Sequence, residues 1–268
     1  MESVLLRAAL APSLALLASL VARRMGPRRG GQLLGAPTTT GPFLAMTWMN
    51  SGPTTTASAA QGGVAGMLVV ACYSLAYARF APARRPARTL LLALLCALGA
   101  AVVGPAFGNV WLSAALTSSV IVLGLLTWPD ADPAGRSPGP ARRWEIPTRM
   151  ALSGVIVTAA LITTAVIGPL VGGVLAALPV LLSVMGPSIH RTAGAAAAAD
   201  LMRGALTSVA GTLGFLLVLS FAPLTLGPAM AFLLALAAFA ATDSLVRHGV
   251  ARVRTLALAR SCAVRGGS

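Results

Sequence analysis

Long apolar blocks constrain this chain more than any other feature of its sequence. Residues 90–103 and 229–241, for example, contain no charged side chain at all. A bilayer whose hydrocarbon core is about 30 Å thick requires about 20 such residues of each helix that crosses it. Of the 268 residues, 57% are hydrophobic and 10% are charged, against about 45–50% and about 25% in soluble domains. These observations predict an all-α integral membrane protein, a polytopic helical bundle.

The blocks predict about nine transmembrane helices. The first block resembles a signal peptide, but no basic stretch precedes it, and Arg23 and Arg24 follow it. Signal peptides have the opposite order of charge, so we expect this helix to be retained. The nine predicted helices lie at residues 4–22, 31–49, 58–79, 88–104, 108–127, 149–167, 171–187, 199–220 and 225–244.

The cations, all of them arginines, occupy alternate gaps between these blocks. Nineteen of the 20 fall in or beside the odd-numbered gaps and the C-terminal tail, and only Arg7 is left over. Because cytoplasmic loops are enriched in basic residues, the distribution predicts an extracytoplasmic N-terminus and a cytoplasmic C-terminus in the inner (cytoplasmic) membrane. The net charge of +14 is therefore interpreted as a topology signal, and we expect no nucleic-acid partner.

A pattern of glycines and prolines occurs twice in the chain. The motif GPxxGGxLxxxP begins at Gly26 and again at Gly168. Two positions separated by this same offset are called counterparts below. The recurrence without a gap predicts a duplication. We expect a first four-helix repeat at residues 1–107, a linker helix and cytoplasmic loop at 108–147, a second four-helix repeat at 148–246, and a cytoplasmic basic tail at 247–268.

The predicted order of helices places the second repeat upside down relative to the first. Four helices and one linker helix precede the second copy, and an odd number of crossings reverses its direction. Inverted repeats of this kind are a recurring plan of secondary transporters, whose substrates bind near the membrane midplane. We expect the two copies to be related by an axis in the membrane plane.

Two threonine triplets bracket the second predicted helix, and the inner one is the main candidate for a binding site. Thr38, Thr39 and Thr40 lie between Pro37 and Gly41-Pro42. Proline interrupts regular helical hydrogen bonding, and polar groups freed at membrane depth need hydroxyls, neighbours or water. The threonines therefore either bind a substrate at a broken helix or only bond to their own backbone. The second copy keeps Pro179 but has apolar residues at the matching positions, so we expect an asymmetric polar lining.

Other polar residues within the blocks are weaker candidates for substrate contact. Gln61 and Arg203 correspond under the repeat, although Arg203 could instead pair with Asp200 one turn away. Asn50 is a further candidate, and Tyr73, Tyr77 and Asn109 have weaker grounds. No carboxylate lies at a predicted midplane, where proton-coupled pumps commonly keep one. Asp200 is the best remaining carrier of a proton or ion, and Asp243 is expected to pair with Arg247.

The sequence carries no set of residues typical of an enzyme or a metal centre. His190 and His248 lack cysteine or carboxylate neighbours at ligand spacing, and the three cysteines share no short spacing. We therefore expect no catalytic residues, no metal and no cofactor.

Residues 173–221 and their counterpart 31–80 resemble GlpM-type proteins, small four-helix inner-membrane proteins of bacteria. The likeness consists of a Gly- and Pro-containing helix, a short polar turn, an Ala-rich helix start with an arginine, and a long apolar run. Its elements are Gly173, Pro179, His190-Arg191, Ala195–Ala199, Arg203 and the run to Phe221. The resemblance implies a bacterial inner-membrane location and a duplicated version of that unit.

These features lead to one main functional hypothesis and two alternatives. The main hypothesis is a small secondary transporter or flippase for a small-molecule or lipid-linked substrate. The alternatives are an intramembrane enzyme acting on a lipid and a structural or accessory membrane subunit. A central cavity lined by the threonines favours transport, a cytoplasmic pocket at Arg203 favours the enzyme, and a bundle without a cavity favours the accessory role.

Overall fold

The computed structural model describes residues 26–106, 109–128 and 162–265, together with residues 24, 147, 151, 155, 158 and 159. Helices dominate the described residues, which contain no strand. They are α2 (Pro27–Gly35), α3 (Thr40–Phe80), η1 (Ala81–Ala83), α4 (Pro86–Ala106), α5 (Val110–Leu126), α7 (Pro169–Ala176), α8 (Val180–Ala193), α9 (Ala195–Phe221), η2 (Ala222–Leu224) and α10 (Pro228–Arg265). The prediction of an all-α protein is confirmed.

Four helical segments of the described residues are long and apolar enough to cross a membrane. They are Pro27–Ala83, which takes in α2, α3 and η1, then Pro169–Ala193, Ala195–Leu224 and Pro228–Gly249. The first of them folds back on itself at Gly52, whose φ of 80° and ψ of −175° interrupt α3. Two shorter apolar helices, Pro86–Val102 and Val110–Leu126, accompany them. Length and composition are those of a helical membrane protein.

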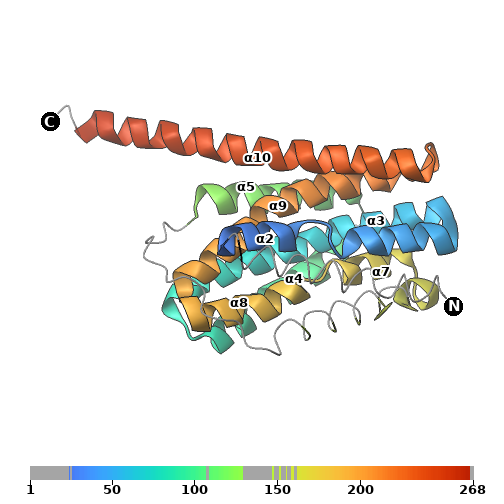
Figure 1. Cartoon of the computed structure of the whole chain (residues 1–268), viewed down its shortest axis with the longest axis horizontal. Helices are drawn as coiled ribbons and strands as arrows, with labels where there is room; N and C mark the ends of the chain where they lie inside the picture. Colours follow the sequence, from blue (N-terminus) through green and yellow to red (C-terminus); the bar gives the residue numbers. More distant parts are fainter. Residues whose placement is uncertain are drawn as a thin grey trace.

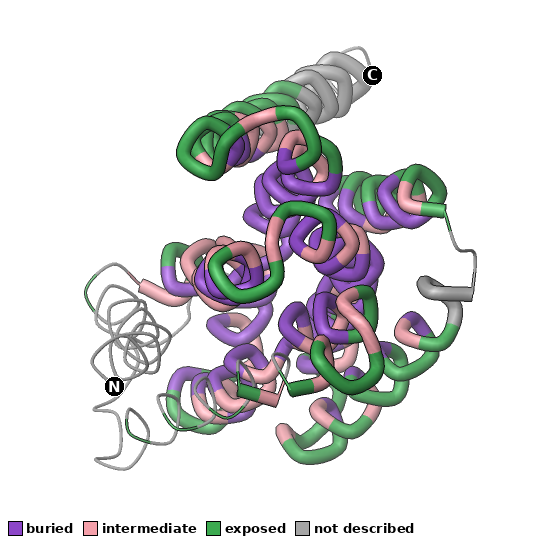
Figure 2. Tube along the Cα trace, turned by 90° about the vertical axis from the view of Figure 1, so that its right-hand side faces the viewer, coloured by how far each residue is buried: buried purple, intermediate pink, exposed green. Residues whose placement is uncertain are grey.

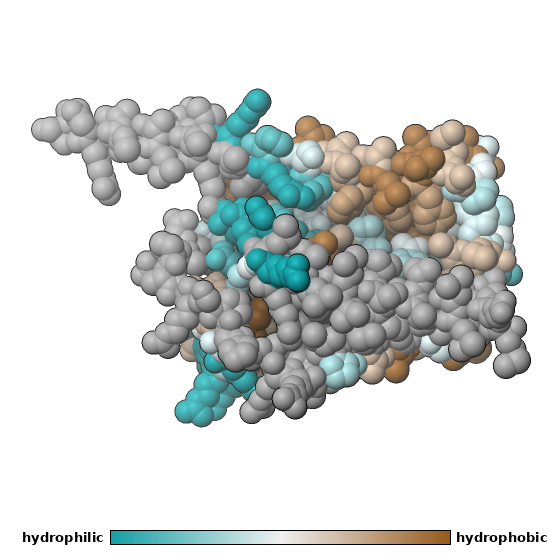
Figure 3. Space-filling view, viewed as in Figure 1, coloured by the Kyte–Doolittle hydropathy of each residue, from teal (hydrophilic) through white to brown (hydrophobic). Residues whose placement is uncertain are grey.

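The helices run back and forth along one axis (Figure 1). The turn from α3 into α4 and the turn from α8 into α9 lie at the same end of the bundle, beyond which α10 extends. Arg79 at the end of α3 donates to the carbonyl oxygen of Thr127 after α5, at 2.6 Å, so α5 ends here as well. Hydrophilic side chains gather at this end (Figure 3). We call it the arginine end.

Two helices form the buried centre of the bundle, and three others give it an exposed apolar surface. The second segment of α3 and most of α9 are buried, and the surrounding helices bury one face and expose the other (Figure 2). The exposed faces of α4, α5 and α10 are apolar, with Leu98, Leu123 and Leu233 more than half exposed. Exposed apolar faces around a packed centre suit helices surrounded by hydrocarbon.

Several predicted boundaries differ from the structure. Helix 31–49 is divided into α2 and the first segment of α3, because the chain leaves helical geometry between them. The last helix does not end near residue 244 but continues through the predicted tail to Arg265, because alanine, leucine and arginine all favour helix. Predicted helices 4–22 and 149–167 lie wholly or mostly outside the described residues, so the count of nine stays a prediction.

Candidate binding site at two broken helices

The first helix break separates α2 from α3 at residues 36–39, where the sequence predicts one. Helix α2 ends when the Ala36 amide donates to the Gln32 carbonyl, and Ala36 itself is extended, with φ −69° and ψ 159°. Helical bonding resumes when the Gly41 amide donates to the Pro37 carbonyl at 2.8 Å. Proline supplies no amide donor and disfavours helical geometry at the preceding residue. The Ala36-Pro37 step therefore accounts for the break.

The second break separates α7 from α8 at residues 177–179. Helix α7 ends at Ala176. The Ala177 and Leu178 amides donate to carbonyls three residues back, those of Val174 and Leu175. Pro179 precedes the first residue of α8, and its carbonyl accepts from both the amide and the hydroxyl of Ser183, at 2.9 and 2.8 Å. Pro179 is the counterpart of Pro37, so the same residue type interrupts both helices.

The two breaks meet at a cavity within the bundle. The space open to a water-sized molecule is about 40 Å³, enough for a few waters. Both breaks contribute to the wall, and Met67 and Val70 of the second α3 segment and Thr212 of α9 close it. The lining residues are Leu34, Gly35, Ala36, Thr39, Thr40, Met67, Val70, Ala176–Leu182 and Thr212.

The cavity lies about midway between the two ends of the bundle. Helix α8 runs from it to the arginine end over 14 residues, which is about 21 Å. The first segment of α3 runs from it to Gly52 at the opposite end over a similar length. Two helices end at the cavity and two begin there, so carbonyl and amide groups of helix termini surround it. A small polar ligand would find donors and acceptors on several sides.

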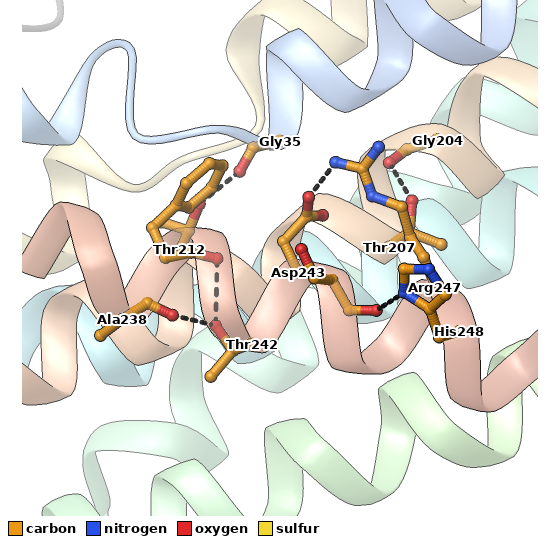
Figure 4. A network of polar contacts seen from close by, with 11 residues as sticks. Gly35, Gly204, Thr207, Thr212, Ala238, Thr242, Asp243, Arg247 and His248 are labelled. Carbon is orange, nitrogen blue, oxygen red and sulfur yellow. Dashed lines mark hydrogen bonds and ion pairs between the residues drawn. The ribbon is translucent and has the colours of Figure 1, made fainter.

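Thr212 ties the first break to the centre of the bundle. Its hydroxyl donates to the Gly35 carbonyl at 2.6 Å across 177 residues of sequence (Figure 4). Gly35 is the last residue of α2, so this bond satisfies a carbonyl that the helix end leaves open. The matching position near the second break is Val70, which carries no hydroxyl.

Glycines allow the half-helices to touch their neighbours backbone to backbone. A Cβ at Gly31 of α2 would lie 1.9 Å from the Leu201 carbonyl oxygen of α9. A Cβ at Gly173 of α7 would lie 1.9 Å from the Ala59 carbonyl oxygen of α3. Both residues of the second contact are counterparts of residues in the first. Small residues that let helix backbones approach are typical of packing in membranes.

A second pair of close contacts follows the same rule. A Cβ at Gly204 would lie 2.0 Å from the Arg28 carbonyl oxygen, and one at Gly62 would lie 1.9 Å from that of Leu170. The glycines with positive φ among the described residues also form two pairs of counterparts, Gly26 with Gly168 and Gly52 with Gly194. These contacts and dihedral angles occur at positions separated by the same offset as the two copies of the motif.

The predicted site residues are only partly brought together. Thr39 and Thr40 line the cavity, whereas Thr38 does not, and its hydroxyl faces the Ala36 carbonyl at 3.5 Å. Asn50 is exposed near the end of the first α3 segment. The outer triplet, residues 54–56, lies within α3, and the Thr55 hydroxyl donates to the Ser51 carbonyl of the same helix at 3.0 Å.

Gln61 and Arg203 are both half-buried, and neither lines the cavity. Their neighbouring glycines contact the beginnings of α7 and α2. These contacts hold the two residues nearer to opposite ends of the bundle, apart from the cavity, and their role in substrate contact stays a prediction. Asp200 is half-buried in the second turn of α9 and also stands apart from it. The predicted ion pair of Asp243 with Arg247 is confirmed (Figure 4).

Sequence reasoning missed Thr212 and the peptide groups of the second break. Thr212 is one of three hydroxyl residues in the middle of α9, with Thr207 and Ser208. The sequence does not show that α2 packs on α9. That contact is what brings Thr212 beside the first break. The described residues contain no group of three histidines, cysteines or acidic residues that could hold a metal ion.

Comparison with family models, curated proteins and solved structures finds no match to this chain. The resemblance to GlpM-type proteins therefore stays a prediction.

Proposed function

We propose that the chain is a small secondary transporter whose substrate binds in the cavity between the two helix breaks. The observation that carries this proposal is the meeting of both breaks at one mid-depth cavity lined by Thr39, Thr40 and Thr212. Interrupted helices at corresponding positions of two halves are the feature that most often marks a transporter site. Irregular backbone at membrane depth is tolerated where it lines a cavity.

The proposal includes an inverted repeat. Its support is the set of reciprocal contacts between counterpart positions, in which α2 packs on α9 and α7 packs on α3. Helix α2 runs away from the arginine end, and α7 with α8 runs toward it (Figure 1). The same proposal places the arginine end in the cytoplasm of a bacterial cell, because basic residues favour that side of the inner membrane.

The two alternatives have less support. A lipid-modifying enzyme would need a polar constellation around Arg203, and the cavity described above lies about 13 Å along α9 from it, at Thr212. An accessory subunit would need no cavity at the helix breaks. A flippase for a lipid-linked substrate would need access for an acyl chain, and the cavity has room for only a few waters.

The test is a thermal-shift screen on the detergent-purified protein with alkali cations, ammonium and small monovalent anions, which fit a space of a few waters. A compound that raises the unfolding temperature of the wild type should lose this effect in Thr39→Val and Thr40→Val. Valine keeps the shape of threonine and removes the hydroxyl, so the unliganded unfolding temperature should change little. Uptake of the same compound into proteoliposomes should fall in parallel.

Thr55→Val is the matched control, because Thr55 does not line the cavity and its hydroxyl bonds to the Ser51 carbonyl of its own helix. Thr38→Val should also leave the shift intact, since Thr38 does not line the cavity. A shift that survives in the Thr39→Val, Thr40→Val double variant would place the site elsewhere. Stabilisation by none of these classes would favour the accessory role.

A further inference from the structure

A row of four polar side chains leads from the cavity toward the arginine end, between α3 and α8. We call it the file, and its members are Tyr73, Ser183, Tyr77 and His190. Its first member is Tyr73, which lies one turn beyond the cavity residue Val70 on the same face of α3. The Tyr73 side chain is fully buried, and its hydroxyl has no hydrogen-bond partner at bonding geometry within the described residues. The Ser183 side chain of α8 lies beside it, and the Ser183 hydroxyl donates to the Pro179 carbonyl at the cavity.

The file continues one turn further to Tyr77 and His190. The Tyr73 and Tyr77 rings are tilted with centroids 6.0 Å apart. The Tyr77 hydroxyl lies 3.4 Å from His190 Nδ1, near the end of α8. Tyr77 is fully buried, whereas His190 is half-buried and partly reaches the surface. The polar groups therefore reach from the buried cavity to the surface at the arginine end.

The opposite half of the bundle has the same arrangement with apolar residues. The counterparts of Tyr73, Ser183 and His190 are Phe215, Gly41 and Trp48. A Cβ at Gly41 would lie 4.0 Å from Phe215 Cζ, so these two positions face each other as Ser183 and Tyr73 do.

Aromatic rings fill the space around Phe215. Phe232 of α10 lies with its ring centroid 6.3 Å from Phe215 and 6.3 Å from Trp48. This half carries no file of hydroxyls among its described counterpart positions. Water that enters the cavity would find hydrogen-bonding groups on one side and a packed aromatic cluster on the other.

We propose that the Tyr73–Ser183–Tyr77–His190 file is the route by which water and small hydrogen-bonding solutes pass between the cavity and the arginine end, while Trp48, Phe215 and Phe232 seal the opposite side in this conformation. The inference rests on the proposed function and adds a direction of access to it. A buried hydroxyl without a protein partner is a position where ordered water is expected. The Tyr77–His190 contact narrows the route at its outer end.

The experiment measures how fast single cysteines react with MTSET, a charged thiol reagent that does not cross membranes. Ser183→Cys is made in a background with Cys72→Ala, Cys96→Ala and Cys262→Ser. Its matched control is Gly41→Cys, the counterpart position in the sealed half. Ser51→Cys and Ala83→Cys, both at exposed positions, mark the two ends of the bundle, because Ala83 lies in η1 at the arginine end and Ser51 beside Gly52 at the other end. Right-side-out and inside-out vesicles present one face each.

Ser183→Cys should react from the face that labels Ala83→Cys, about tenfold faster than Gly41→Cys reacts from either face, because only the former lies on a hydrated route. His190→Ala should raise that rate further by opening the end of the file. Tyr73→Cys is a second reporter on α3, in case Ser183→Cys does not fold. Protection of both reporters, or reaction of Gly41→Cys at an equal rate, would overturn the proposed route.

The reaction needs no substrate, so its outcome is separate from that of the proposed function. Protected reporters together with a ligand effect that depends on Thr39 and Thr40 would remove the route and keep the transporter. Reactive reporters with no effect of the threonine variants would keep a hydrated route and remove the binding site.

Discussion

The units α2–α3 and α7–α8–α9 share a backbone plan and differ in chemistry. In both, a short helix begins at a Gly-Pro pair, breaks near a proline, and resumes until a glycine with positive φ turns the chain. In both, a glycine of the short helix lies against a carbonyl of the other unit. Yet the first break has three threonines where the second has a valine and two leucines, and Tyr73 has Phe215 as its counterpart. Residues that set the path of the backbone are kept in both units, whereas residues that set polarity are not.

This difference separates two requirements on the molecule. Close crossing of the half-helices needs glycine at a few positions, because a Cβ there would overlap a backbone oxygen that cannot move aside. A route with one open side needs the two halves to differ in hydrogen-bonding groups. Two units can therefore share close glycine contacts and still differ in the polarity of the side chains around the cavity.

The largest loss of stability is expected from substitutions where the two units touch. Gly31→Ala and Gly173→Ala each place a Cβ 1.9 Å from a carbonyl oxygen of the opposite unit. We expect each to cost about 3 kcal/mol or more, the upper range for overpacking, which corresponds to a fall in unfolding temperature of roughly 6–12 °C. Fluorescence-detected size exclusion after heating measures it.

Gly99→Ala is the control for this pair, because Gly99 is exposed on α4 and a Cβ added there would have nothing within 4 Å. Alanine favours helix, so this variant should be as stable as the wild type or slightly more stable. Tolerance of Gly173→Ala beside a severe effect of Gly31→Ala would break the equivalence of the two units.

A smaller change in stability is expected when a hydroxyl is added in one half or removed from the counterpart position in the other. Phe215→Tyr places a hydroxyl within an aromatic cluster, where lack of a partner should cost about 1–3 kcal/mol. Tyr73→Phe removes a hydroxyl that already lacks a protein partner among the described residues, so the free energy of unfolding should change by about 0.5 kcal/mol or less. Thermal unfolding of both variants in one detergent gives the comparison. Equal tolerance of both would mean that the two halves are equally polar.

The smallest effect concerns the bond that only the first break possesses. Thr212→Val removes the donor to the Gly35 carbonyl and should cost about 1 kcal/mol. Val70→Thr adds a hydroxyl at the counterpart position and should leave stability nearly unchanged, because it can bond to its own helix. Thr207→Val is the control, since the Thr207 hydroxyl bonds within α9 to the Gly204 carbonyl at 2.7 Å. A loss with Thr207→Val as large as with Thr212→Val would show that the bond between units has no special weight.

The sequence by itself determined the helical membrane class of the protein and the position of the first break. Apolar blocks of membrane-spanning length require helices, because backbone polar groups must be satisfied within the segment in hydrocarbon. Pro37 and Pro179 mark the breaks through their missing amide donors. These are local properties, and a pattern of residues along the chain is enough to predict them.

Only the tertiary structure decided which residues share the cavity. Thr212 and Val70 line it, while Gln61 and Arg203 do not, although all four lie on the two central helices α3 and α9. Helical periodicity assigns residues to a face but not to the element that the face contacts. The crossing of α2 over α9 and of α7 over α3 chose the partners, because close backbone contact at four glycines holds each half-helix at one height along its neighbour.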